Sequence, residues 1–65
     1  MNKYRVKRYG LSFTPKYVSA SSPQEAVEIA GIGRPPYRQV PLDYKDRYMF
    51  VDYWNRRITV VLQDG

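Results

Sequence analysis

The chain has 65 residues, a length at which a folded protein buries only a limited share of its surface, so we expect one small domain over residues 1–65. It contains no Cys and no His, which excludes disulfides and argues against a structural zinc site and against catalysis by either residue type. The formal net charge is +5, from 11 Lys and Arg against 6 Asp and Glu, which favours a polyanionic partner. Because the sequence offers no catalytic constellation, we expect a binding role without enzymatic activity or a cofactor.

The first third of the chain predicts two strands. Residues 3–9 are rich in β-forming types, and their alternation places Tyr4 and Val6 on one face. The opposite face receives the basic residues of this strand, which are Lys3, Arg5 and Lys7. Residues 16–20 predict a second strand that forms a hairpin with the first.

A capped helix follows the second strand. Ser22 is an N-cap residue, and Glu25 follows it at the spacing of a capping box, which predicts a helix over residues 23–30. Gly31 or Gly33 supplies the left-handed residue that ends the helix. The residues expected to face the sheet are Ala26, Val27, Ile29 and Ala30.

The last half of the chain predicts a stiff loop and then a hairpin. Residues 34–43 contain three prolines, which favours an extended loop with room for one short strand. Two β-rich runs, 47–54 and 57–63, flank Asn55 and Arg56, and a turn at this point predicts an antiparallel pair.

This turn fixes which side chains of the hairpin share a face. The paired residues on the face toward the helix are Tyr53 with Ile58, Val51 with Val60, and Met49 with Leu62. The other face carries Tyr48, Phe50, Asp52, Trp54, Arg57, Thr59 and Val61. A three-residue loop shifts the pairing by one and spoils this segregation, so we disfavour it. The expected fold is α+β: a small antiparallel sheet in the order ββαββ, with room for one extra short strand, and a single helix on one face.

The second face of the sheet is the candidate binding surface, because one short helix covers only one side. Exposed aromatic rings among cations are typical of proteins that bind single-stranded nucleic acid, in which the rings stack on bases and the cations contact phosphates. The residues expected to bind nucleic acid or another partner are Lys3, Arg5, Lys7, Tyr9, Tyr48, Phe50, Trp54, Arg56 and Arg57.

Other interpretations of the same residues stay open. The proline-rich loop can fold back over the aromatic face, with Tyr37, Val40 and Leu42 as its lid, or two copies can stack these faces as a homodimer. The basic strand can be a solvated edge that prevents aggregation. In a second functional hypothesis, the same Tyr, Trp and Arg residues bind an acidic protein surface, as an inhibitor or adaptor. In a third, the chain is a subunit of a larger particle.

Two resemblances add context. The segment 17–30 resembles the transition from strand to capped helix found in many small α+β domains, which implies structure rather than activity. The short, Tyr-rich, basic and Cys-free character is similar to that of small accessory proteins of phages and mobile elements, including those that inhibit host nucleic-acid machinery. No apolar run reaches the roughly 20 residues that cross a bilayer, so we expect a soluble, cytoplasmic protein with no membrane partner.

Overall fold

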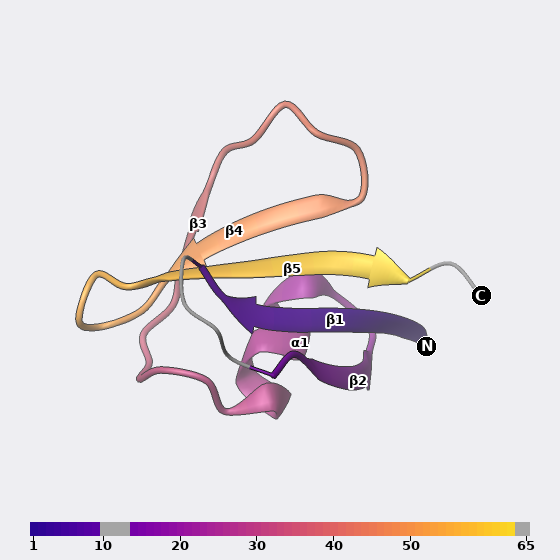
Figure 1. Cartoon of the computed structure of the whole chain (residues 1–65), viewed down its shortest axis with the longest axis horizontal. Coiled ribbons are helices and arrows are strands. Elements are labelled where there is room, and N and C mark those ends of the chain that lie inside the picture. The colour runs from indigo at the N-terminus through magenta and orange to yellow at the C-terminus, as the bar shows by residue number, and fades with distance from the viewer. Residues whose placement is uncertain (10–13, 64–65) are drawn as a thin grey trace.

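The structure, a computed structural model, describes residues 1–9 and 14–63 of the chain. Its elements are β1 (Asn2–Arg8), β2 (Lys16–Ala20), α1 (Pro23–Ala30), β3 (Arg38–Val40), β4 (Arg47–Val51) and β5 (Arg57–Gln63). The strands form one antiparallel sheet in the order β2-β1-β5-β4-β3 (Figure 1). The expected α+β fold is confirmed, and the extra short strand of the proline-rich segment is β3.

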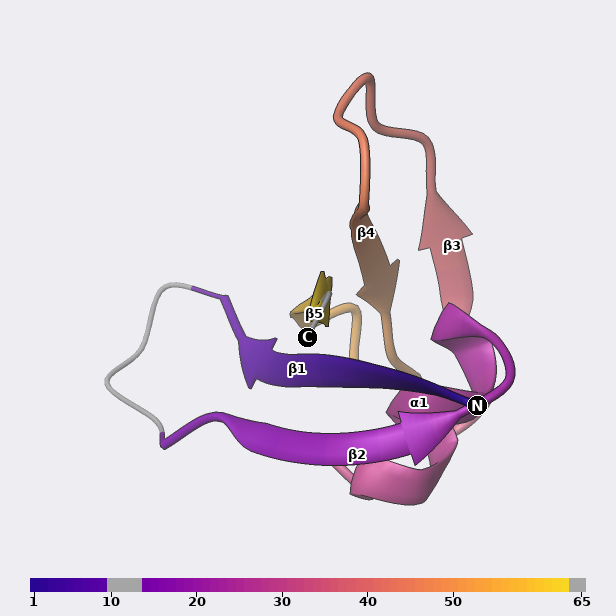
Figure 2. The same cartoon turned by 90° about the vertical axis from the view of Figure 1, so that its right-hand side faces the viewer.

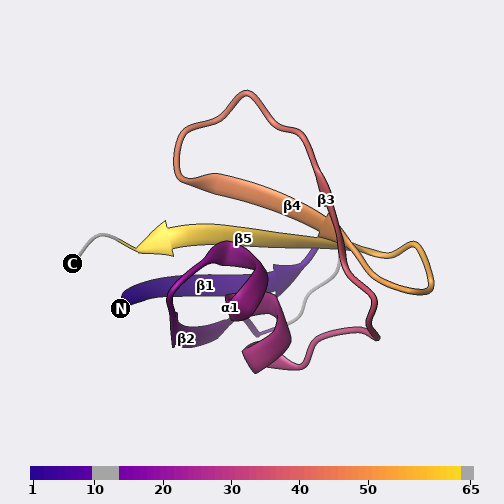
Figure 3. The same ribbon diagram turned by 180° about the vertical axis from the view of Figure 1, so that it is seen from behind.

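The sheet is strongly twisted, and the helix covers only part of it. Figure 2 shows β3 and β4 standing steeply against β1 and β2, with β5 at the corner between the two pairs. Seen from behind, α1 lies against β1, β2 and β5 (Figure 3). In the described ranges, 1–9 and 14–63, no helix lies on the opposite side of these strands. No helix among the described residues is long and apolar enough to cross a membrane.

Local capping explains why the helix has the bounds that the sequence predicts. The Ser22 hydroxyl oxygen accepts a hydrogen bond from the backbone N–H of Glu25 at 3.2 Å. Gly31 ends the helix in the left-handed conformation, with φ of 68°. The Lys16 ammonium of β2 donates to the carbonyl of Ala30 at 2.9 Å, where a cation also complements the helix dipole.

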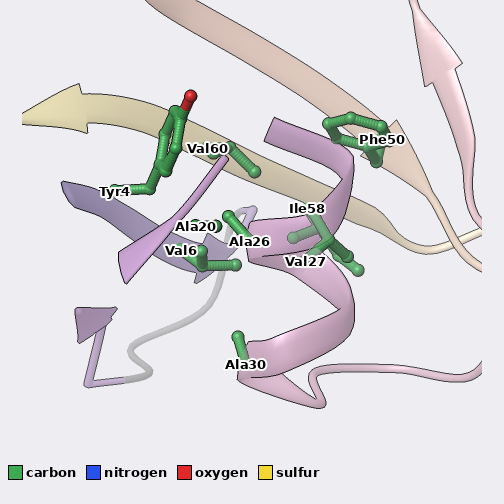
Figure 4. Packing of buried hydrophobic residues seen from close by; sticks show 9 residues of the cluster. All are labelled: Tyr4, Val6, Ala20, Ala26, Val27, Ala30, Phe50, Ile58 and Val60. Carbon is green, nitrogen blue, oxygen red and sulfur yellow. The ribbon is translucent and has the colours of Figure 1, made fainter. Parts of the chain in front are cut away.

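The core lies between α1 and the sheet face that the helix covers (Figure 4). Its buried residues are Tyr4, Val6, Ala20, Ala26, Val27, Ala30, Phe50, Ile58 and Val60. Burial of Tyr4 and Val6 confirms the alternation expected for the first strand. The expected burial of Ile29 is wrong, because this residue lies beyond the narrow stripe of the helix that faces the sheet and is 53% exposed.

The expected register of the last hairpin is also wrong. Phe50 pairs with Ile58, and Tyr48 pairs with Val60, so the connection spans the five residues 52–56 rather than the two or four residues that give the expected register. The pairing is displaced by an odd number of residues, which exchanges the two faces of β4 relative to β5. Phe50 is therefore fully buried and Tyr48 packs against the core, and their expected exposure on a stacking face is corrected.

A buried aspartate ends β4 earlier than its β-rich sequence predicts. The Asp52 side chain is 6% exposed, and its two carboxylate oxygens accept hydrogen bonds from the backbone N–H groups of Arg56 at 2.8 Å and Arg34 at 3.2 Å. Asn55 adopts a positive φ of 62° within this turn. A buried carboxylate needs such donors, so the backbone turns around Asp52 instead of continuing as a strand.

Candidate nucleic-acid interface

The sheet face that lies opposite the helix collects basic side chains from four strands. Alternation along each strand and the pairing between strands place Lys3, Arg5, Lys7, Arg38, Arg47 and Arg57 on this side, which we call the basic face. Among the strand residues that the structure describes, none is Asp or Glu. The acidic side chains of the described chain belong to the helix and the loops.

These cations are close enough for their fields to add. Arg5 and Arg47 both pair with Val61, from the two strands that flank β5. Strands lie about 4.8 Å apart, so this pair is separated by roughly 10 Å, which is about one Debye length at 0.1 M salt. Because no strand carboxylate offsets them, the basic face presents a positive surface that a polyanion can neutralise.

The structure brings together four of the predicted cations and adds two. Lys3, Arg5, Lys7 and Arg57 share the basic face, as their positions in the strands imply. Arg38 and Arg47 were missed by sequence reasoning. Arg38 lies two residues before Val40, and Arg47 lies two residues before Met49, so each arginine shares a strand face with an apolar residue. Which side of the sheet that face takes follows only once the register of β4 is known.

The turn between β4 and β5 carries a second group of exposed side chains. We call Arg34, Tyr53, Trp54 and Arg56 the turn cluster. The rings of Tyr53 and Trp54 meet edge to face, with centroids 6.2 Å apart and planes inclined by 74°. The guanidinium carbon of Arg34 lies 4.9 Å from the Tyr53 ring centre, and that of Arg56 lies 5.4 Å from the Trp54 ring centre. Both rings remain open to solvent, with Tyr53 61% and Trp54 52% exposed.

Backbone contacts between distant segments build the turn cluster. The N–H of Tyr53 donates to the carbonyl of Arg34 at 2.7 Å, and Asp52 binds the N–H of the same Arg34. These two bonds fix the segment before β3 against the turn. Sequence reasoning placed Tyr53 in the core and left Arg34 in a loop, because no local pattern reveals this contact.

Tyr9 connects the basic face to the turn. It is 54% exposed, and the guanidinium carbon of Arg57 lies 5.7 Å from its ring centre. The predicted residues Tyr9, Arg56 and Arg57 therefore lie around one end of the sheet, next to Trp54, with which Arg56 makes its cation–π contact.

The proline-rich segment leaves Trp54 half exposed, so it does not form a lid over the expected aromatic face at this residue. Tyr37 instead packs against the core, and its hydroxyl donates to the carbonyl of Ile32 at 3.0 Å. Burial, and to a smaller extent the negative charges of Asp52 and Glu28, raises the pKa of this hydroxyl above its ordinary value. Tyr37 thus stays a neutral hydrogen-bond donor at neutral pH and holds the loop to the core.

The loop that follows β3 shapes a groove over the basic face. Leu42 and Tyr44 of this loop line a hollow of about 440 Å³ together with Arg5, Arg47 and Met49. Tyr48 also lines it, so this predicted site residue contacts both core and groove.

Within residues 1–9 and 14–63, no group of three or more Asp, Glu, His or Cys is arranged to hold a metal ion. Comparison with protein-family models, with curated proteins and with solved structures finds no match to this chain.

Proposed function

We propose that this protein is a non-enzymatic module that binds single-stranded nucleic acid through the basic face and the turn cluster. The observation that carries the proposal is the basic face itself, on which cations from four strands gather and no strand residue is acidic. In this role, the cations contact successive phosphates of the strand.

Base stacking in this proposal falls to Trp54 and Tyr53 instead of the buried Phe50. Arg34 and Arg56 already lie over the Trp54 ring, at 5.9 Å and 5.4 Å from its centre, and a base that stacks on an occupied face of the ring must displace the guanidinium there. A cation–π contact at an exposed site contributes about 0.5–1 kcal/mol, whereas a stacked base contributes about 1–3 kcal/mol. The stacked base therefore binds the ring more strongly than the guanidinium does, and the displaced guanidinium can contact a phosphate.

The competing candidate is an acidic protein surface. The observation that favours it is the pre-ordered contact of Tyr53, Trp54 and Arg34, since Tyr, Trp and Arg dominate the energetics of protein interfaces. Nucleic acid remains the preferred partner because the basic face extends across four strands, which suits a long polyanion.

Titration with a single-stranded oligonucleotide at several salt concentrations tests the proposal. If all six cations of the basic face contact phosphates, log K should fall with log salt with a slope of about −4. Arg47→Gln should weaken binding and make this slope less steep by about 0.7. Lys45→Gln is the matched control, because it removes the same charge from the neighbouring loop and should change the slope little. Binding that does not depend on salt, or equal effects of both variants, would refute the phosphate role.

Removing the exposed indole separates stacking from folding. Trp54→Ala should weaken oligonucleotide binding by about 1–3 kcal/mol, because a stacked base loses its platform. The free energy of unfolding should change little, since half of the side chain is already in water. Anisotropy of a labelled oligonucleotide reports binding of the variant, and urea denaturation reports its stability. If Trp54→Ala binds single-stranded and duplex oligonucleotides as tightly as the unchanged protein does, Trp54 is not a stacking platform, and an acidic protein surface becomes the partner to test.

A further inference from the structure

A hollow of about 560 Å³ lies at the end of the sheet where β1 ends and β5 begins. The residues that line it are Arg8, Tyr9, Asn55, Arg56 and Arg57. Three of these five residues are arginines, and no acidic residue of the described chain lines the hollow. Arg56 and Arg57 bring two guanidinium groups to this recess, whereas the side chain of Arg8 belongs to the face of β1 that the helix covers and is not counted with them.

Backbone contacts fix the walls of this arginine hollow. The N–H of Tyr9 donates to the carbonyl of Arg57 at 2.9 Å, which ties the end of β1 to the start of β5. Asn55 is held in its left-handed conformation by donating its N–H to the carbonyl of Asp52 at 3.0 Å. The hollow is thus part of the folded turn and does not require rearrangement of the backbone to form.

Aromatic rings orient both of these guanidinium groups. Arg57 lies over the ring of Tyr9, and Arg56 lies over the ring of Trp54. A guanidinium that rests on a ring keeps its edge N–H groups available, and these donors match phosphate oxygens in bidentate fashion. The Asn55 amide and the Tyr9 hydroxyl are further donor types at the hollow.

The hollow suits a phosphate that carries more charge than one in the middle of a strand. An internal phosphodiester has one negative charge, whereas a phosphate monoester carries about −1.5 to −2 at pH 7 and presents three acceptor oxygens. The two guanidinium groups of Arg56 and Arg57 match the double charge of the monoester better. The hollow also lies at the rim of the basic face, because Arg57 belongs to both.

We propose that the arginine hollow binds the terminal phosphate monoester of a nucleic-acid strand whose remaining phosphates lie along the basic face. This inference rests on the proposed function and adds to it a preference for phosphorylated strand ends. The turn cluster then lies beside the terminal nucleotide, because Arg56 lines the hollow and contacts Trp54.

Competition between strands that differ only at their ends tests the inference. Three unlabelled oligothymidylates of equal length, with a 5′-phosphate, a 3′-phosphate or hydroxyls at both ends, displace one labelled strand from the full chain. At least one phosphorylated strand should bind about tenfold or more tightly than the strand with two hydroxyl ends, because charge-assisted hydrogen bonds contribute at this level. The preferred end shows the polarity of the strand on the basic face.

Two variants of equal charge locate the effect. Arg57→Gln removes a cation that lines the hollow, and it should abolish the preference for the phosphorylated strand. Arg38→Gln removes a cation of the basic face outside the hollow, so it should weaken all strands alike and keep the preference. Both side chains are exposed, and circular dichroism verifies that both variants fold.

The outcomes separate this inference from the proposed function. Tight and equal binding of all three strands overturns the role of the hollow and leaves the proposed function standing. A preference that survives in Arg57→Gln also overturns it. Absence of binding by any strand overturns both, whereas a preference that is lost in Arg57→Gln and kept in Arg38→Gln supports both.

Discussion

Phe50→Ala is expected to lower the free energy of unfolding by about 3–5 kcal/mol, the range found when a buried aromatic ring is removed from a core. Phe50 is fully buried and belongs to the cluster that joins β4, β5 and α1. Small proteins have a total stability of about 5–15 kcal/mol, so this single change should leave the chain close to its unfolding threshold. Urea denaturation followed by circular dichroism measures the loss.

Trp54→Ala is the matched control for this experiment. It removes a larger ring, yet a ring that is 52% exposed contributes much less to the core than one that is fully buried. The two variants should therefore affect different properties: Phe50→Ala should lose folding stability, and Trp54→Ala should lose affinity for oligonucleotides. A Phe50→Ala protein that keeps its stability but no longer binds would contradict the register of β4 and restore Phe50 to the binding surface.

The parts of the fold that local signals determine could be predicted from the sequence. Ser22 and Glu25 fix the start of α1, and Gly31 fixes its end, through contacts within one helical turn. The alternation of Tyr4 and Val6 with basic residues assigns the faces of β1 in the same way. Each of these features depends on residues that are neighbours along the chain.

The register of the last hairpin could not be predicted, because a distant segment decides it. Asp52 appears within a run of β-forming residues, and only its contact with the backbone of Arg34 reveals why the strand stops. A local interpretation favours the short turn at Asn55, and the resulting displacement exchanges the faces of β4. One misplaced turn thus moved Phe50 from the core to the expected binding surface.

The residues of the candidate site also fall into those that local signals reveal and those that only tertiary contacts reveal. The cations of β1 were found because alternation alone assigns them to a face, and Arg57 was found although the register assumed for it was wrong. Arg34 and Tyr53 were missed, since the hydrogen bond that joins them spans from the loop before β3 to the turn after β4. Exposed aromatic and basic side chains were expected, but their arrangement depends on tertiary contacts.

Gly33→Ala is expected to destabilise the protein by at least about 3 kcal/mol and to disrupt the turn cluster. A Cβ at this position would lie 2.5 Å from the Asp52 carboxylate oxygen Oδ2, so the side chain of Asp52 must move. Its displacement weakens the hydrogen bonds to the N–H groups of Arg34 and Arg56, and bonds to a charged group contribute about 1.5–3 kcal/mol each. Gly33 also has a φ of 75°, which costs an L-residue about 1–2 kcal/mol more.

Gly31→Ala separates the two contributions, because Gly31 has a similar φ of 68° but nothing within 4 Å of the added Cβ. It should lose only the conformational share, about 1–2 kcal/mol in urea denaturation. Fluorescence of Trp54 should stay unchanged in Gly31→Ala and should shift in Gly33→Ala, where the anchor of the turn is displaced. Equal losses of stability with unchanged fluorescence in both variants would mean that Asp52 does not hold the turn, and that the turn cluster and the arginine hollow are ordered by other contacts.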